Sequence, residues 1–526
     1  MAGPAWLLGV LGEDAQDQAR GLWEASGLTV SSSVDSVAGA GLVATSDGWM
    51  WSHTPLPAGI DPARARLHLD AATLRHTPSG WELRTGVSGA QGIFWSARDG
   101  NLAVASHPAM LATPGMPPDW DAWAHIIGFG GPLGPRTPWG GVRRLQADEA
   151  LSADTPGRWR VERRSWEFRD ADPPGRGDVR EIGAAVEAAV ARLPTPMQVP
   201  LSGGLDSRVL AVAAARRDHR ITAWTTSKDD GTIQEELIAR AVARRLGIPH
   251  TLVTPRADGF EEDFLRYARL VGHSAPFHVW ALALADRLGE RHGVVLDGLG
   301  GVLFRGTAIR ATGAAGSPAD RRFAASYPYV PSAAGVLRKR VEDQVRARCL
   351  AGYLELTGTV QDHPDADALS VFLCTITPGI SWGPFGVMAS GSRVAAPLLD
   401  RDVVLASRAV RRAQPDLAQL PRVLAHWDLQ LASIRPTARP VMSRRLRPSR
   451  GASATTARAF RRALLGSPVA GLLSERLQEG SLEAWRATLA SIPARHVLQS
   501  LWLLADWIDR HEPTGATPDV LLERVG

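Results

Sequence analysis

The chain has 526 residues, of which 44% are hydrophobic and 21% are charged. At about 150 residues per domain this length predicts two to four domains, and the composition excludes both a single small domain and an intrinsically disordered chain. The 59 lysines and arginines exceed the 54 acidic residues by five charges. Spread over this length, that excess gives no argument for binding nucleic acid.

Cysteine usage and hydropathy indicate the compartment. Cys349 and Cys374 are the two cysteines, too few for a disulfide framework or a cysteine-only metal site. Glu13 and Asp14 come too early for a secretory signal, and no uninterrupted apolar run reaches the roughly 18 residues of a membrane span. We therefore expect a cytoplasmic protein without a membrane partner.

Roughly the first 165 residues are mostly short strand patterns separated by turns, with little helix. Asp99-Gly100 between two apolar runs is typical of a hairpin, and apolar spacing predicts one helix over residues 119–129. Prolines and glycines near Asp170 then indicate a linker. The expected strands are residues 41–51, 81–84, 93–95 and 102–105.

Beyond the linker, helical and short strand patterns alternate. Such alternation predicts a parallel sheet with helices on both faces, hence an α/β fold. From about residue 331 onward the pattern is mainly helical. The expected helices are residues 179–193, 207–217, 233–246, 279–291, 336–350, 403–412 and 497–508, and the expected strands are 198–201, 221–225, 251–253 and 294–296.

The most specific motif is Ser202-Gly203-Gly204-Leu205-Asp206-Ser207, placed between an apolar strand and a helix start. Glycines let the backbone approach an anion closely, and amides at a helix N-terminus together with serine hydroxyls can hold phosphate. Asp206 supplies an oxygen ligand of the kind that Mg²⁺ prefers. The motif therefore predicts a site for a phosphate or pyrophosphate group, although a plain strand-to-helix turn with capping residues has the same pattern.

Residues 201–207 resemble the pyrophosphate loop of ATP-pyrophosphatases that adenylate carboxylates, and with the β-rich first region they are similar to the asparagine synthetase family. Similar segments follow in the family's order: Gln234-Glu235-Glu236, Asp297-Gly298-Leu299-Gly300-Gly301 and residues 393–400. The resemblance implies an amidotransferase-like domain of the N-terminal-nucleophile type (αββα) over residues 1–168. It also implies a synthetase domain over residues 178–526, with a sheet like that of the adenine nucleotide alpha hydrolases and a helical extension.

The resemblance further implies ATP and Mg²⁺ as cofactors. Asp206 and Asp297 would be both metal ligands and catalytic residues. The nucleotide site would comprise Leu201, Ser202, Gly203, Gly204, Asp206, Ser207, Thr226, Asp297 and Gly298.

One departure from the family concerns the nucleophile. Glutamine-using members begin with a cysteine after Met removal, because its thiolate attacks the glutamine amide. Here Ala2 and Gly3 stand at those positions. We expect a catalytically silent N-terminal domain and an amine of the substrate itself as nucleophile, as in β-lactam synthetases and lasso-peptide cyclases.

Two more departures lie in the synthetase region. Relatives carry an aspartate after the last small residue of the Asp297 loop, where this chain has Val302, so either Asp297 replaces that ligand or the loop binds less metal. Leu299 occupies the place of a proton-handling residue, and no general base can be named. No lysine follows Lys339, although relatives use a late lysine to stabilise charge.

Residues 435–462 instead hold nine arginines and no carboxylate. Arginine can stabilise phosphate or oxyanion charge but cannot act as a base. Arg444 and Arg445 are the candidates for this role, and a solvated basic surface is the alternative. His273 and His278 lack a zinc spacing and are expected to pack or cap.

The loop of Lys228, Asp229 and Asp230 lies at the edge where nucleotides bind in such sheets, so it either contacts ribose or adenine or is simply solvated.

The resemblance as a whole implies a lasso-peptide cyclase, an ATP-dependent ligase that releases AMP and pyrophosphate. It would adenylate a side-chain carboxylate of a precursor peptide and close a macrolactam with the peptide's N-terminal amine. A leader peptidase and a leader-recognition protein would be further partners. The alternatives are a β-lactam-type or other amide ligase, and a degenerate scaffold that binds nucleotide or peptide.

Overall fold

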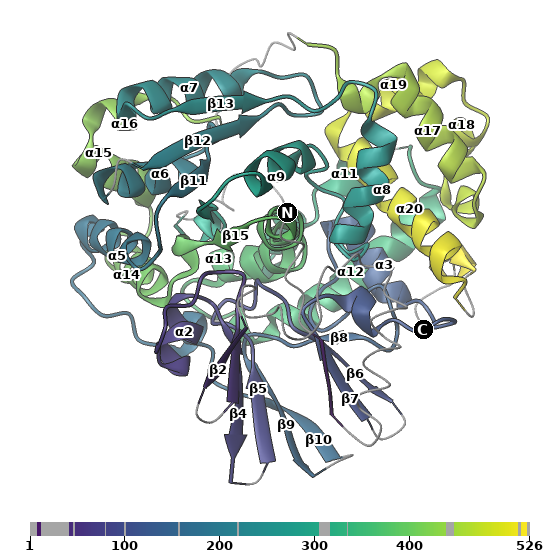
Figure 1. The fold of residues 1–526 in the computed structure, drawn as a ribbon. Helices are drawn as coiled ribbons and strands as arrows, with labels where there is room; N and C mark the ends of the chain where they lie inside the picture. Colours follow the sequence, from purple (N-terminus) through teal and green to yellow (C-terminus); the bar gives the residue numbers. More distant parts are fainter. Residues whose placement is uncertain are drawn as a thin grey trace.

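The computed structural model describes most of the chain, and Figure 1 shows its arrangement. The described residues are 8–11, 42–45, 48–78, 80–98, 101–155, 158–217, 220–304, 316–333, 335–437, 447–513 and 517–522. Three sheets organise them, two antiparallel in the N-terminal region and one parallel in the middle of the chain. The prediction of an α/β protein with a parallel sheet is confirmed.

The N-terminal strands form a four-stranded and a six-stranded antiparallel sheet, drawn in purple and blue at the bottom of Figure 1. Residues 41–51, expected as one strand, form a tight hairpin of two strands in which Leu42 faces Trp51. The strands on either side of Asp99-Gly100 pair antiparallel, as the predicted hairpin requires, and the two turn residues lie outside the described residues. In sheet order the strands are β1 (Leu8–Leu11), β7 (Asn101–Ala105), β6 (Phe94–Arg98) and β8 (Arg143–Arg144), then β10 (Arg158–Arg163), β9 (Glu149–Thr155), β5 (Gly80–Arg84), β4 (Ala72–Thr77), β3 (Gly48–Trp51) and β2 (Leu42–Thr45).

The parallel sheet has five strands, all pairing in the same direction. Its three central strands are short and largely buried, as expected where helices cover both faces, and the edge strand β13 is more exposed. The order is β13 (His250–Val253), β12 (Ile221–Thr226), β11 (Met197–Pro200), β14 (Val294–Leu296) and β15 (Arg393–Ala395). The helices of this region are α5 (Val179–Ala191), α6 (Asp206–Arg217), α7 (Gln234–Leu246), α8 (Phe260–Leu270), α9 (Ala281–Gly289), α14 (Arg401–Ala413), α15 (Gln419–Trp427) and α16 (Leu429–Ser433).

The expected helical extension is present. Its C-terminal helices gather in yellow on one side of the parallel sheet in Figure 1. The helices are α10 (Pro318–Ser326), α11 (Tyr329–Ser332), α12 (Lys339–Thr357), α13 (Ala366–Val371), α17 (Ala454–Leu465), α18 (Glu475–Gln478), α19 (Leu482–Leu489) and α20 (Ile492–His511).

The N-terminal region shares its core with the rest of the chain. Helix α3 (Trp120–Phe129) is capped by the Asp119 carboxylate and ends at Gly130 in the left-handed conformation, and it packs among the C-terminal helices. The Trp123 and Trp507 rings meet edge to face with centroids 5.6 Å apart. The segment at His53 bonds to the backbone of Val394 on β15, which covers that edge of the parallel sheet. The predicted linker near Asp170 follows the short helix α4 (Glu167–Asp170), and the domain limits themselves stay a prediction.

One helical run in the described part of the chain, Ala366–Ser390, is long and apolar enough to cross a membrane by length and composition alone. Within the fold, 72% of its most apolar window is buried. That burial is typical of a core helix, whose apolar residues are covered by protein.

Candidate functional site

The strand order places two loops side by side at one edge of the parallel sheet. After β11 the chain adds β12 and β13 on one side, then returns to add β14 and β15 on the other. The loops that leave β11 and β14 therefore diverge at a point where the strand order reverses, which is where ligands bind in open parallel sheets. These are the serine–glycine loop (residues 202–207) and the glycine turn (residues 297–304).

The serine–glycine loop is held by its own side chains. The Ser207 hydroxyl accepts a hydrogen bond from the Ser202 amide (3.1 Å), and the two serine hydroxyls lie 3.0 Å apart. The Gly204 amide donates to the Ser202 hydroxyl at 3.1 Å. Helix α6 begins directly afterwards at Asp206, so the positive end of the helix dipole faces the loop. This geometry matches the predicted anion site.

The two glycines of this loop serve different purposes. A Cβ at Gly203 would lie 2.4 Å from the Thr437 methyl carbon, and the Thr437 amide donates to the Gly203 carbonyl (3.2 Å). A Cβ at Gly204 would meet only the Ser202 hydroxyl, at 3.2 Å. Gly203 therefore makes room for a later segment of the chain, and Gly204 leaves the backbone open.

Leu201 and Thr226 end their strands on either side of the loop. The Leu201 amide donates to the Trp224 carbonyl (2.7 Å), and its side chain is buried in the core of the sheet. The Thr226 hydroxyl donates to the Trp280 carbonyl at 3.3 Å. Both residues support the edge of the sheet on which the loop stands.

The two predicted metal ligands lie in the adjacent loops. A Cβ at Gly301 would fall 2.0–2.3 Å from the Asp206 carboxyl atoms, so the glycine turn lies directly against that side chain. Gly298 also lies close to the start of α6, where a Cβ would be 3.1 Å from the Asp206 Cβ. A side chain at Gly301 would displace the Asp206 carboxylate, and one at Gly298 would be tightly packed.

The Asp297 carboxylate accepts a hydrogen bond from the Leu299 amide at 2.8 Å. Burial raises the pKa of Asp297 to about 6; the negative charge of Asp206 adds to the rise, and the Leu299 amide opposes it. A divalent cation bound between these two carboxylates would relieve the repulsion that Asp297 experiences from Asp206. The donor set fits Mg²⁺, because both ligands are carboxylate oxygens.

The departures from the family are visible in the glycine turn. Leu299 is 4% exposed and packs in the core around the parallel sheet, so it offers no group that could move a proton. Val302 lies in the short 3₁₀ helix η3 (Gly301–Phe304) and also packs against that core. No third acidic ligand is present among residues 298–304.

The loop after β12 is tied by ion pairs rather than left solvated. Asp229 is buried and pairs with Arg450 at 3.0 Å, while Lys228 pairs with Glu235 at 2.8 Å. The Asp230 carboxylate accepts from Thr232 within the turn. The alternative of a freely solvated loop is therefore wrong for Asp229.

The arginine-rich segment returns across this same edge. Arg447 bonds to the Ser227 hydroxyl at 2.8 Å and to the Glu236 carboxylate at 2.5 Å. Arg444 and Arg445, the candidates predicted for charge stabilisation, lie outside the described residues. Thr437 and Arg447 are the described residues on either side of these two arginines. Thr437 bonds to Gly203, and Arg447 bonds to Ser227.

The two histidines singled out in the sequence have packing roles, as expected. His273 is buried and pairs with Asp506 at 2.9 Å. His278 has a φ of 66°, and its ring contacts those of Phe277 and Trp280. Burial lowers the pKa of His278 to about 4, with a further contribution from Lys228, so its imidazole is neutral at pH 7.

A second carboxylate cluster lies where the N-terminal region meets β15. His68 Nδ1 is 3.3 Å from the Asp400 carboxylate and 3.8 Å from that of Asp402. Arg192 also pairs with Asp400, whose other oxygen accepts from the Asp402 amide to cap α14. Arg192 already supplies the positive charge that balances Asp400. The cluster is therefore explained as an ion pair with a helix cap and needs no metal ion.

Both cysteines are buried away from the two loops. The Cys349 thiol donates to the Ala124 carbonyl at 3.3 Å, and Cys374 is fully buried. Burial raises the pKa of both thiols well above the ordinary range. Neither is a thiolate at neutral pH, so neither is a nucleophile.

Sequence reasoning missed the contacts that come from far along the chain. Thr437 against Gly203, and Ser407 and Arg411 against the glycine turn, join segments more than a hundred residues apart. The absence of a third ligand after Gly301 was the one sequence signal that the glycine turn is unusual.

Comparison with known families finds one match in the chain. Residues 181–415 match the family model described as asparagine synthase, and no curated protein matches the chain. The matched segment contains the parallel sheet, both loops at the switch point and helix α14. Enzymes of this family use ATP and Mg²⁺. Residues 181–415 are thus similar to the asparagine synthase family.

Proposed function

We propose that this protein is an ATP- and Mg²⁺-dependent amide synthetase that activates a peptide side-chain carboxylate and joins it to the peptide's own N-terminal amine. The observation that carries the proposal is the pairing of the serine–glycine loop with Asp206 and Asp297 at the switch point of a parallel sheet. This pairing supplies amides and hydroxyls for a pyrophosphate and carboxylates for a cation.

Asp206 and Asp297 would hold the cation. When bound, Mg²⁺ neutralises the triphosphate and stabilises the charge on the leaving pyrophosphate. The cradle that Gly298 and Gly301 form around Asp206 is consistent with this role, because it leaves space beside the carboxylate that any larger residue would fill.

The reaction has two steps. An oxygen of the substrate carboxylate attacks the α-phosphorus of ATP, forming an acyl-adenylate while the bond to pyrophosphate breaks. The amides and serine hydroxyls of the serine–glycine loop would hold that pyrophosphate. The amine then attacks the acyl carbon, the bond to AMP breaks, and one proton is released. The second step depends mainly on holding amine and adenylate in contact.

The choice of nucleophile rests on the cysteines. Glutamine hydrolysis needs a reactive thiolate, whereas both thiols here are buried with raised pKa values. In this proposal an amine of the substrate replaces ammonia, and the N-terminal domain has a structural or peptide-binding role.

Among such synthetases we favour a lasso-peptide cyclase, by the resemblance of the loop Asp297-Gly298-Leu299-Gly300-Gly301. The substrate is then a precursor peptide, with a leader peptidase and a leader-recognition protein as partners in the cytoplasm. A role with nucleic acid or membrane is not part of the proposal.

Product analysis tests the proposal. Purified protein is incubated with Mg-ATP and a leaderless precursor peptide encoded near its gene, and nucleotides and peptide mass are followed together. AMP, pyrophosphate and a peptide lighter by one water support the cyclase. AMP without that mass change points to a different acceptor, as in a β-lactam-type or other ligase. ATP binding without AMP from any carboxylate contradicts the synthetase and leaves a scaffold.

A further inference from the structure

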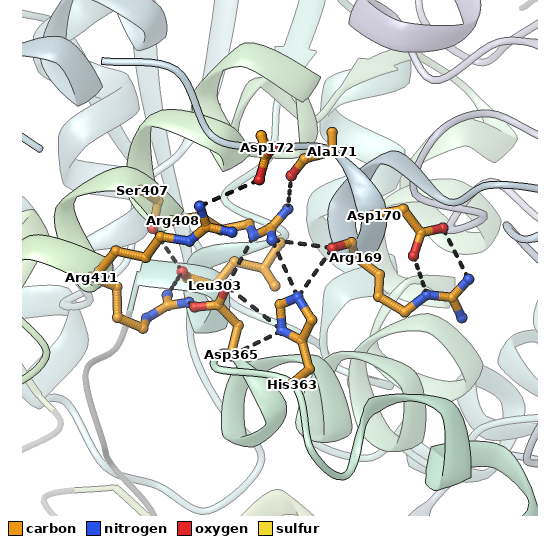
Figure 2. A network of polar contacts seen from close by, with 11 residues as sticks. Arg169, Asp170, Ala171, Asp172, Leu303, His363, Asp365, Ser407, Arg408 and Arg411 are labelled. Carbon is orange, nitrogen blue, oxygen red and sulfur yellow. Dashed lines mark hydrogen bonds and ion pairs between the residues drawn. The ribbon is translucent and has the colours of Figure 1, made fainter. Parts of the chain in front are cut away.

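Helix α14 presents two hydrogen-bond donors to a single backbone carbonyl in the glycine turn. The Ser407 hydroxyl donates to the Leu303 carbonyl at 2.8 Å, and the Arg411 guanidinium donates to the same oxygen. Figure 2 shows Leu303 between these two side chains. Ser407 is completely buried and Arg411 is 9% exposed, so water does not compete for this carbonyl.

The opposite face of the same turn lies against Asp206, one of the two proposed metal ligands. Within the turn, the Leu303 amide donates to the Gly300 carbonyl (2.8 Å), so fixing Leu303 also fixes the glycines before it. A Cβ on Gly300 would lie 2.7 Å from the Leu399 side chain on one side of the turn. On the other side, Gly301 lies against the Asp206 carboxylate. The turn is therefore held between Asp206 and the segment that begins α14.

A turn of this composition needs such support. Gly298, Gly300 and Gly301 have few steric restraints of their own, and Gly300 has a φ of 102° that other residues rarely adopt. Within the turn, the Asp297 carboxylate accepts from the Leu299 amide at 2.8 Å, and two backbone bonds add to it. The bonds from Ser407 and Arg411 add support from outside the turn.

Arg411 is itself oriented by a buried carboxylate. Asp365 is 2% exposed and pairs with Arg411 and, at 2.9 Å, with Arg408. Arg408 also donates to the carbonyls of Ala171 (2.8 Å) and Arg169 (3.1 Å), at the linker between the two predicted domains. Figure 2 shows this continuous set of contacts from the linker to Leu303.

We propose that Ser407 and Arg411 are positioning residues for the divalent-cation site, acting through the Leu303 carbonyl on Gly301 and Asp206. This inference rests on the proposed function, since it assumes that Asp206 and Asp297 bind the cation. Residues that orient metal ligands without touching the metal affect affinity by about 10- to 100-fold when they are changed. The effect expected here is on cation affinity rather than on the chemical step.

The test uses Mn²⁺ as a spectroscopic probe. Free Mn²⁺ is titrated by electron paramagnetic resonance with full-length protein and a non-hydrolysable ATP analogue, for the wild type, Ser407→Ala and Arg411→Lys. Lysine keeps a positive charge beside Asp365 but lacks the planar fork that reaches two acceptors at once. Arg412→Ala is the matched control, because Arg412 is the next residue on the same helix, is exposed and pairs with Asp172 outside the turn.

The expected result is an Mn²⁺ affinity weakened about tenfold in Ser407→Ala and in Arg411→Lys, with Arg412→Ala equal to the wild type. In the synthetase assay, the two variants should need about tenfold more Mg²⁺ while kcat at saturating Mg²⁺ stays close to the wild-type value. Ser407→Ala is the milder change, so it gives an answer even where Arg411→Lys fails to fold by its melting curve.

Mn²⁺ affinity equal to the wild type in a folded Ser407→Ala and a folded Arg411→Lys would overturn the inference. So would a loss of kcat that excess Mg²⁺ does not restore. If the wild type forms no AMP but both variants still weaken Mn²⁺ binding, the positioning role stands and the proposed synthetase activity fails.

Discussion

The two loops that form the candidate site are held in opposite ways. The serine–glycine loop is stabilised by side chains five residues apart, Ser202 and Ser207, whose hydroxyls bond to each other and to the loop backbone. The glycine turn is held from outside, by donors 104 and 108 positions further along the chain. The anion-binding half of the site is therefore built mainly by local bonds, with one distant bond from Thr437 to Gly203, and the cation-binding half depends more on the tertiary structure.

This difference has consequences for stability and function. A loop that bonds to itself keeps its shape when distant contacts are weakened, because its partners are already close in the chain. The glycine turn loses its position whenever α14 shifts. Substitutions in the serine–glycine loop should thus act mainly on nucleotide binding, and substitutions behind the glycine turn should act on the cation.

The largest expected effect is at the carboxylate that both loops contact. Asp206→Ala removes the side chain at the start of α6 against which Gly301 packs. Loss of this charge should lower the rate of carboxylate-dependent ATP–pyrophosphate exchange by about a thousandfold, since a bound cation supplies several kcal/mol. Asp286→Asn, at an exposed ion pair with Arg266, is the control and should retain full activity.

The network behind the glycine turn is the next most sensitive place. Asp365→Asn would leave the guanidinium groups of Arg408 and Arg411 buried without their carboxylate. Breaking such a pair from one side costs about 3 kcal/mol of the free energy of unfolding. Thermal melting measures the loss, and Asp367→Asn, which breaks the more exposed pair with Arg322, should change stability by less than about 1 kcal/mol.

The same aspartate gives a pH dependence of known sign. Burial raises the pKa of Asp365, but Arg411 and Arg408 outweigh it and bring the pKa below its ordinary value of 3.8. A lowered carboxyl pKa stabilises the fold above the unfolded value, and that contribution is lost as the pH falls through the folded value. The stability difference between wild type and Asp365→Asn should be constant near neutrality and shrink in melts below about pH 4. A difference that grows in acid would contradict this sign.

Gly301→Ala tests the contact between the loops directly. The added methyl group would lie 2.0–2.3 Å from the Asp206 carboxyl atoms, so either the turn or the carboxylate must move. Exchange activity should fall about a hundredfold at moderate Mg²⁺, as expected when a metal ligand loses its orientation. Gly358→Ala is a matched control, because a Cβ there would meet nothing within 4 Å. Equal activity of the two variants would show that Gly301 does not shape the site.

The smallest effect is expected within the self-supported loop. Ser202→Ala removes the acceptor for the Gly204 amide and the partner of Ser207. One such hydrogen bond contributes about 1 kcal/mol, so the KM for ATP should rise by up to about tenfold with kcat little changed. Ser467→Ala, which loses a bond at the end of α17, serves as the control. A rise in the Mg²⁺ requirement instead of the KM for ATP would reverse the roles assigned to the two loops.

The contrast between local and distant contacts also explains which parts of the fold and of the site could be predicted from the sequence. The serine–glycine loop, the strands around it and the alternation of helices lie within short stretches of sequence, so their patterns identify them. Asp297 was identified by resemblance to a family motif. The residues of that motif do not indicate which distant side chains position the glycine turn. Ser407, Arg411 and Asp365 carry no local signal, because an arginine or serine on a helix is usually exposed and only the tertiary fold turns them inward.

The burial of the Asp229 loop escaped prediction for a similar reason. Asp229 and Arg450 are 221 positions apart, and a charged loop is more often solvated than paired. The hairpin within residues 41–51 was missed although Asp47-Gly48 carries the same turn signal as Asp99-Gly100, because strand patterning runs through both halves.

The route of the oxygen atoms tests the central claim most directly. A peptide whose reactive side-chain carboxylate is labelled with ¹⁸O is incubated with the protein and Mg-ATP, and the nucleotide products are analysed by mass spectrometry. Attack on the α-phosphorus predicts one ¹⁸O atom in AMP and none in pyrophosphate. Label in inorganic phosphate together with ADP would show attack at the γ-phosphorus, and it would contradict the assignment of the serine–glycine loop, Asp206 and Asp297 as an ATP-pyrophosphatase site.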